Sequence, residues 1–189
     1  MSEKLLEIHS REEFRDWLSQ NGKSKRECWI AVKRGKPVDP NVFYYLDAVE
    51  EAICFGWIDS VQKQIDGVIY QRFSPRKNAK QWTELNKERA RRLIRLGLMT
   101  PAGKKVLPPL GARSYHLDPD VEEALKKARC HSKFKAFPPL YQRVRASNVA
   151  FYKKKEPEVY AIALKRLIEA TKKGEMYGEW NDYGRLLED

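Results

Sequence analysis

The sequence predicts an α+β fold, in which a small antiparallel sheet with packed helices is followed by a C-terminal helical annex. Three observations lead to this prediction. Two β-rich segments flank Asp66-Gly67, a dipeptide that favours the type I′ turn of a hairpin. Helix signals with caps lie on both sides of that hairpin. Strand signals end before residue 105, so we expect an α+β domain over residues 1–110 and a helical segment over residues 116–189.

The first elements follow from short local signals. Ser10-Arg-Glu-Glu13 is a capping box that predicts a helix over about residues 11–20. Residues 27–34 are rich in β-formers and predict a strand. Residues 45–55 carry apolar side chains at helical spacing, and Gly56 is placed to end that helix.

The hairpin is predicted to pair residues 57–65 with residues 68–74. With a two-residue turn, Asp59 is expected opposite Ser74 and Val61 opposite Arg72. Because side chains alternate along a strand, one face of the hairpin is then expected to carry Trp57, Asp59, Val61, Tyr70, Arg72 and Ser74.

Helix signals dominate the rest of the chain. Residues 83–96 have helical spacing and end at Gly97. Proline at the first helical turn, with or without a polar cap, predicts four more helices, which open at Thr100-Pro101, Asp118-Pro119, Pro138-Pro139 and Pro157. Residues 107–115 are predicted to be a linker, and Trp180 and Tyr183 are candidates for docking the tail.

Positive charge is concentrated in one part of the sequence. The chain of 189 residues has 37 Lys and Arg against 26 Asp and Glu, a net charge of +11. Residues 72–105 hold 11 basic and two acidic residues, a local net charge of +9. This pattern favours an anionic partner, either nucleic acid, phosphate or an acidic protein. Lys87, Arg91 and Arg95 project from one face of the helix over 83–96 and form the predicted polyanion-binding surface. The alternative is that this face is solvated and only confers solubility.

A second pattern places polar residues inside an apolar helix stripe. At about 100° per residue, Asn86 and Arg89 fall among the apolar residues of the helix over 83–96. An unpaired buried guanidinium is costly, so Asp59 is the predicted partner of Arg89. Two interpretations remain open: a structural ion-pair network, or a site for a carboxylate or phosphate formed by Trp57, Asp59, Arg72, Arg76, Trp82, Asn86 and Arg89.

Motifs of catalysis, metal binding and export are absent from the sequence. It has no P-loop, no nucleophile elbow, no HExxH and no dinucleotide-binding glycine pattern. We therefore assign no catalytic residue and expect no cofactor. Three distant cysteines and three histidines without ligand spacing predict reduced thiols and no metal site. The absence of a signal peptide or a long apolar run predicts a cytoplasmic protein without membrane insertion.

Several of these segments together resemble a known family. Phe55-Gly-Trp-Ile-Asp59, Arg72-Phe-Ser-Pro-Arg76, the set Trp82, Asn86 and Arg89, and Gly97-x-Met99 closely resemble motifs of the YdeI/OmpD-associated family. Members of that family are described as bacteriocin-protection proteins. The similarity runs over about residues 14–107, and the later helices resemble the C-terminal helical segment of the family. The resemblance implies a bacterial accessory protein of the cytoplasm with no assigned reaction.

These observations lead to two functional hypotheses. The first is an accessory protein that binds an anionic partner through a basic hairpin–helix surface, in bacteriocin tolerance or envelope stress. The alternative is an enzyme that acts on a small phosphorylated or carboxylated substrate at the Asp59/Arg89 site.

Overall fold

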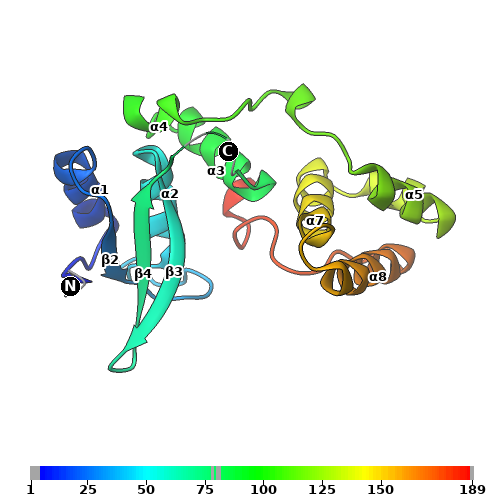
Figure 1. Ribbon diagram of the computed structural model, residues 1–189, viewed down its shortest axis with the longest axis horizontal. Coiled ribbons are helices and arrows are strands. Elements are labelled where there is room, and N and C mark those ends of the chain that lie inside the picture. The colour runs from blue at the N-terminus through cyan, green and yellow to red at the C-terminus, as the bar shows by residue number, and fades with distance from the viewer. Residues whose placement is uncertain (1–4, 78, 80–81, 188–189) are drawn as a thin grey trace. The chain divides into compact units, whose positions relative to one another are not determined.

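The computed structural model describes residues 5–77, 79 and 82–187 and divides into two compact units. Unit 1 comprises residues 1–82 and 89–108, and unit 2 comprises residues 83–88 and 109–189. Lys80, one of the cations of the basic stretch, and the last two residues of the tail lie outside the described residues. Helices and a single small sheet make up the described chain, so the predicted α+β class is confirmed (Figure 1).

Unit 1 contains the sheet. Its elements, with the shared helix α3, are β1 (Leu5–Leu6), α1 (Arg11–Asn21), β2 (Cys28–Ala31), α2 (Tyr45–Cys54), β3 (Trp57–Ile65), β4 (Val68–Pro75), α3 (Glu84–Arg95) and α4 (Pro101–Lys105). The strands lie in the order β1-β2-β4-β3. The sheet is mixed rather than purely antiparallel, because the short strand β1, which the sequence did not predict, pairs parallel to β2.

The predicted cap at the start of α1 is present. The Ser10 side chain accepts a hydrogen bond from the backbone N–H of Glu13 at 3.1 Å. The return bond of the capping box is displaced by one residue, because the Glu13 carboxylate accepts from the N–H of His9 at 2.7 Å. The first bond satisfies a donor that a helix N-terminus leaves without a partner, and the second ties the residue before the cap to the first turn.

The hairpin begins as predicted and then departs from the predicted register. Asp66 and Gly67 have φ values of 50° and 80°, as a type I′ turn requires. Pairing is as predicted from Ile65 opposite Val68 to Gln62 opposite Gln71. Between Asp59 and Gln62 a β-bulge then shifts the register by one residue.

The bulge makes the predicted hairpin face wrong. Asp59 pairs with Phe73 and Ile58 with Ser74, so Asp59 lies on the face of Phe73. Arg72 and Ser74 lie on the opposite face, because successive side chains of a strand alternate. A single extra residue in β3 therefore separates Asp59 from Arg72.

The core of unit 1 lies between α1, α2 and one face of the sheet (Figure 1). Phe14 of α1 packs on Phe73 of β4 with ring centroids 5.3 Å apart. Trp17 contacts Trp57 edge-on at 5.7 Å. These contacts fix the hairpin against α1 and bury Trp57.

Unit 2 is helical. Besides the first turns of α3, it contains η1 (Ala112–Ser114), α5 (Pro119–Lys127), α6 (His131–Ala136), α7 (Pro139–Tyr152), α8 (Pro157–Lys173) and η2 (Arg185–Leu187). Its core includes Val121, Phe134, Tyr141, Val144 and Leu167. Helix α6 was not predicted, and Cys130 before it makes no side-chain cap bond.

The tail of unit 2 docks through one of its two candidate aromatics. The buried Trp180 contacts Tyr141 edge-on at 5.5 Å between ring centroids. Tyr183 is exposed. Among the described residues, no helix combines the length and the apolar character needed to cross a bilayer.

Candidate functional site

Helix α3 buries the two polar residues that the helical wheel placed in its apolar stripe. Arg89 is 7% exposed and Asn86 is also buried. Leu96, by contrast, is 46% exposed, because the helix ends at Arg95 and the chain turns away at Gly97 with a φ of 70°. Asn86 belongs to unit 2 and Arg89 to unit 1, so Asn86 is not part of the unit 1 site described next.

Asp59 has a partner that the sequence analysis did not name. The phenol of Tyr45, at the start of α2, donates a hydrogen bond to Oδ2 of Asp59 at 2.6 Å. Burial raises the pKa of Tyr45, and the Asp59 carboxylate raises it further, against a smaller lowering by Arg89 and Arg34. The phenol therefore stays protonated and holds Asp59 in place.

Arg34 is fixed in orientation by neutral groups. Its guanidinium lies 3.6 Å from the centroid of the Tyr45 ring. Its Nη2 donates to Oε1 of Gln62 at 2.9 Å and to Oε1 of Gln71 at 2.5 Å. The side chain is exposed, and within the described ranges no acidic group lies within ion-pair distance of it. The sequence analysis did not single out Arg34.

The orientation of Gln71 is itself determined. Its Nε2 donates to the carbonyl oxygens of Val61 at 3.1 Å and Arg72 at 3.3 Å. The amide oxygen is thereby turned toward Arg34. Val61 lies within the β-bulge, so the irregularity of β3 supplies one of these acceptors.

Arg76 occupies a more buried position just after β4. Its guanidinium lies 3.9 Å from the centroid of the Trp82 ring, and the residue is 7% exposed. Its backbone N–H donates to Gly56 O at 2.9 Å. Burial lowers the pKa of Arg76 to about 10, because the opposing effect of Asp59 offsets the loss of hydration only in part.

The structure thus brings together some of the predicted site residues and separates others. Seven residues of unit 1 are connected to one another through Asp59, and we call them the hairpin cluster: Arg34, Tyr45, Asp59, Gln62, Gln71, Arg76 and Trp82. Arg72 lies on the other face of the sheet, where it forms an ion pair with Glu27. Trp57 is buried in the core and donates to Gly22 O at 3.2 Å. Arg89 lies close enough to Tyr45 to lower its pKa.

The predicted solvated face of α3 is only partly exposed. Lys87 pairs with Glu84 at 2.6 Å within unit 2, and both side chains are largely buried. The spacing i,i+3 on a helix brings the two together. Arg91 is half-buried, and Arg95 is exposed.

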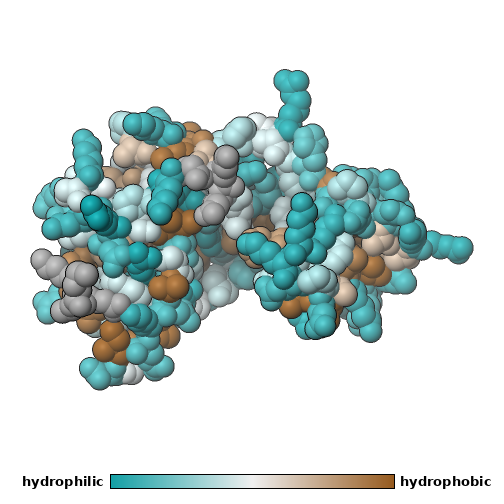
Figure 2. All heavy atoms as spheres, viewed as in Figure 1, coloured by the Kyte–Doolittle hydropathy of each residue, from teal (hydrophilic) through white to brown (hydrophobic). Residues whose placement is uncertain are grey.

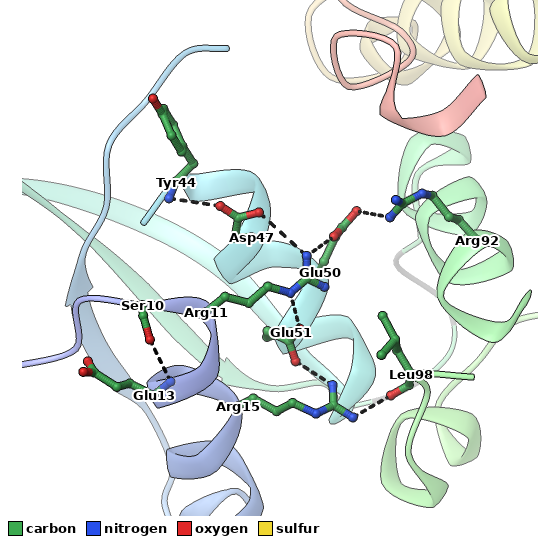
Figure 3. Close-up of polar contacts among 10 residues, drawn as sticks. All are labelled: Ser10, Arg11, Glu13, Arg15, Tyr44, Asp47, Glu50, Glu51, Arg92 and Leu98. Carbon is green, nitrogen blue, oxygen red and sulfur yellow. Dashed lines mark hydrogen bonds and ion pairs between the residues drawn. The ribbon is translucent and has the colours of Figure 1, made fainter. Parts of the chain in front are cut away.

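A second arginine cluster in unit 1 surrounds two buried glutamates (Figure 3). Glu50 and Glu51 of α2 are 0% and 1% exposed. Arg11 reaches Glu50 at 2.7 Å and Glu51 at 2.6 Å. Arg15 pairs with Glu51 at 2.7 Å and Arg92 with Glu50 at 3.1 Å. We call these five residues the carboxylate network.

The charges in the carboxylate network stabilise one another. Burial acts to lower the pKa of Arg11, but Glu50 and Glu51 outweigh it and raise that pKa overall. Arg15 also donates to the carbonyl oxygen of Leu98 at 3.0 Å. The network joins α1, α2 and α3 within unit 1. The sequence analysis missed it, although Arg11 and Arg15 at i,i+4 are a signal for two cations on one helix face.

The described residues offer little support for thiol or metal chemistry. Cys28 and Cys54 are buried, and burial raises the pKa of each thiol to about 12. Thiols with such pKa values are poor nucleophiles. Within the described ranges, no group of three potential metal ligands is brought together.

The surface is predominantly polar on the face drawn in Figure 2, where apolar residues form separate patches among hydrophilic ones.

One comparison with known proteins gives a match. A family model described as Domain of unknown function (DUF8412) matches residues 6–106, which include both arginine clusters of unit 1. No curated protein and no solved structure matches the chain.

Proposed function

The chain belongs to the family described as Domain of unknown function (DUF8412), and from its hairpin cluster we propose that it is a binding protein for an anionic partner. Arg34 is the observation that carries this proposal. An arginine that serves only the fold is usually neutralised by a carboxylate, as Arg11 and Arg15 are here. Arg34 is instead held by a ring and two amides, which fix its position, and among the described residues no carboxylate lies at ion-pair distance from it.

Arg76 supports the same proposal. Its lowered pKa of about 10 means that the charged form of this side chain is disfavoured by burial. An anion bound nearby would restore the lost stabilisation, because an opposite charge favours the protonated guanidinium. Asp59 is linked to both arginines, because it accepts from the phenol on which Arg34 stacks and acts to raise the pKa of Arg76. A bound anion would therefore compete with this carboxylate for the two cations.

The resemblance to the YdeI/OmpD-associated family adds a cellular setting. We place this binding in the bacterial cytoplasm, in bacteriocin tolerance or envelope stress. The setting rests on the resemblance alone, whereas the anion-binding proposal rests on the contacts of unit 1.

Fluorescence anisotropy with labelled single-stranded DNA, duplex DNA and heparin, at low and high salt, tests the proposal. We expect binding at low salt that weakens as salt rises, because basic groups release counterions on binding a polyanion. Arg34→Ala should weaken binding to all three probes. Asp59→Asn should strengthen it, because the variant removes the competing negative charge.

Arg95→Gln provides the control, since Arg95 is exposed like Arg34 but belongs to the basic stretch of residues 72–105. Its loss should weaken binding less than the loss of Arg34. An effect of Arg95→Gln equal to that of Arg34→Ala would place the binding on the face of α3 instead. Absence of binding at low salt would refute the proposal.

The alternative function is an enzyme that acts on a small phosphorylated or carboxylated substrate at Asp59. The contact that favours it is the 2.6 Å hydrogen bond between Tyr45 and Asp59, which could orient a carboxylate base. Asp59→Asn separates the two functions. A binding protein should gain affinity for anions, whereas an enzyme should lose turnover of a test phosphomonoester.

A further inference from the structure

We propose that the outer face of the Arg34 guanidinium is a stacking platform for a nucleobase, so that the anionic partner is a single-stranded nucleic acid. The inference rests on the proposed anion-binding function and names the class of ligand. It follows from which parts of Arg34 are occupied and which part is left open.

One face of the guanidinium is covered. The Tyr45 ring lies against it at 3.6 Å, and the phenol of Tyr45 is anchored to Asp59. Arg34 is nevertheless an exposed residue. A separation of 3.6 Å is a stacking distance, so we infer that the exposed part of Arg34 includes the flat face opposite the Tyr45 ring.

The edges of the guanidinium are unsuited to paired recognition of an anion. A carboxylate or a phosphate normally binds through two parallel N–H groups, and each of the two paired edges of arginine includes Nη2. Nη2 already makes two hydrogen bonds here, to Gln62 and to Gln71. What remains for a ligand is the flat face, with separate donors at Nε and Nη1.

A flat, cationic face matches a nucleobase better than it matches a simple anion. Bases that are not paired in a duplex stack on aromatic rings and on arginine planes, and every base offers such a surface. The phosphates of the same strand would be attracted by the positive charge of Arg76, which belongs to the same cluster of unit 1. Duplex DNA cannot stack in this way, because its bases are already enclosed between neighbours.

The test compares two labelled probes of equal length and charge: an oligothymidylate and an oligomer of abasic sugar phosphates. With the full chain, anisotropy at low salt should show roughly tenfold or more tighter binding of the oligothymidylate, the size expected of base stacking. Duplex DNA should gain no such advantage over the abasic probe.

Three variants identify the side chain responsible. Arg34→Ala should bring oligothymidylate binding down to that of the abasic probe. Arg34→Lys keeps the charge without the plane, so it should retain abasic binding and lose the advantage of the bases. Lys36→Ala removes a neighbouring exposed charge and should preserve that advantage. Circular dichroism and thermal midpoints confirm that each variant is folded.

The outcomes separate this inference from the function on which it rests. Equal binding of the two probes by the unmodified chain, or an advantage that survives in Arg34→Lys, would overturn the stacking platform and leave anion binding intact. Failure to bind any of the probes would overturn both.

Discussion

The arginines of unit 1 are held in two opposite ways. In the carboxylate network, Arg11, Arg15 and Arg92 contact two glutamates that are almost entirely buried. In the hairpin cluster, Arg34 contacts a phenol ring and two amide oxygens and remains exposed. The side chain is the same, but one set is neutralised by acids and the other is held by neutral groups.

The difference shows how environment separates a structural charge from an available one. Buried charges must be paired, because the loss of hydration is costly. Each arginine of the network is therefore paired with a buried glutamate, and these pairs join α1, α2 and α3. Arg34 avoids most of that cost through exposure, so neutral partners suffice to orient it. Arg76 is intermediate, since it is buried and its pKa is lowered by that burial.

The largest expected effect comes from breaking the carboxylate network. Both Arg11 and Arg15 contact Glu51, and Glu51→Ala removes this shared partner. We expect the free energy of unfolding to fall by about 5 kcal/mol, at the upper end of the range for breaking a buried pair. Urea unfolding followed by circular dichroism measures it. The control is Glu123→Ala, whose exposed pair with Lys127 should be lost without a measurable change in midpoint.

Arg89→Ala should have the next largest effect on stability. Arg89 is 7% exposed, so its removal leaves buried polar surroundings adapted to a cation. We expect a loss of about 3 kcal/mol. Arg95→Ala, at an exposed position on the same helix, should cost less than about 0.5 kcal/mol. Similar melting shifts in the two variants would show that burial does not distinguish them. Arg91 is a poorer control, because it is half-buried.

A smaller effect concerns the charge of Arg76. The native pKa of about 10 lies below that of an ordinary arginine, so this side chain is cationic at neutral pH and loses its proton as the pH rises through that value. Arg76→Gln should therefore weaken heparin binding at about pH 8 and make little difference at about pH 11. At each pH, the dissociation constant of the variant is divided by that of the unmodified chain, which removes the effect of other titrating groups. A ratio that stays constant across this range would contradict the lowered pKa.

The smallest effect is expected from Arg34→Ala on stability. The side chain is exposed and its contacts are one ring and two amides. Its loss should cost less than about 1 kcal/mol, while polyanion binding falls. Thermal unfolding and anisotropy on the same preparation test the two halves together. A large loss of stability would mean that Arg34 belongs with the network arginines as a structural residue.

Elements with local signals were predicted closely. The cap at Ser10 places the start of α1, and the φ values of Asp66 and Gly67 are those that an Asp-Gly turn requires. Proline opens α4, α5, α7 and α8 as expected. Each signal depends on backbone preferences and bonds within about four residues, which a sequence displays directly. Helix α6, which lacks a side-chain cap, was missed.

The candidate site was predicted only in part. The structure brings Asp59, Arg76 and Trp82 into the hairpin cluster, whereas Arg72 and Trp57 lie elsewhere. The bulge accounts for Arg72, since one extra residue reverses the face of every side chain beyond it. The segment between Asp59 and Gln62 is Ser60-Val61, which contains no glycine to signal a bulge.

The sequence by itself determined the turn, the caps, the α+β class and the concentration of positive charge. The tertiary structure alone decided which charges are neutralised. Arg11 and Glu51 are 40 residues apart, and Arg34 and Gln71 are 37 apart. Whether such distant groups meet depends on how helices pack on the sheet and on the register of the hairpin, because side-chain contacts between elements are set by burial and strand pairing rather than by neighbours in the chain.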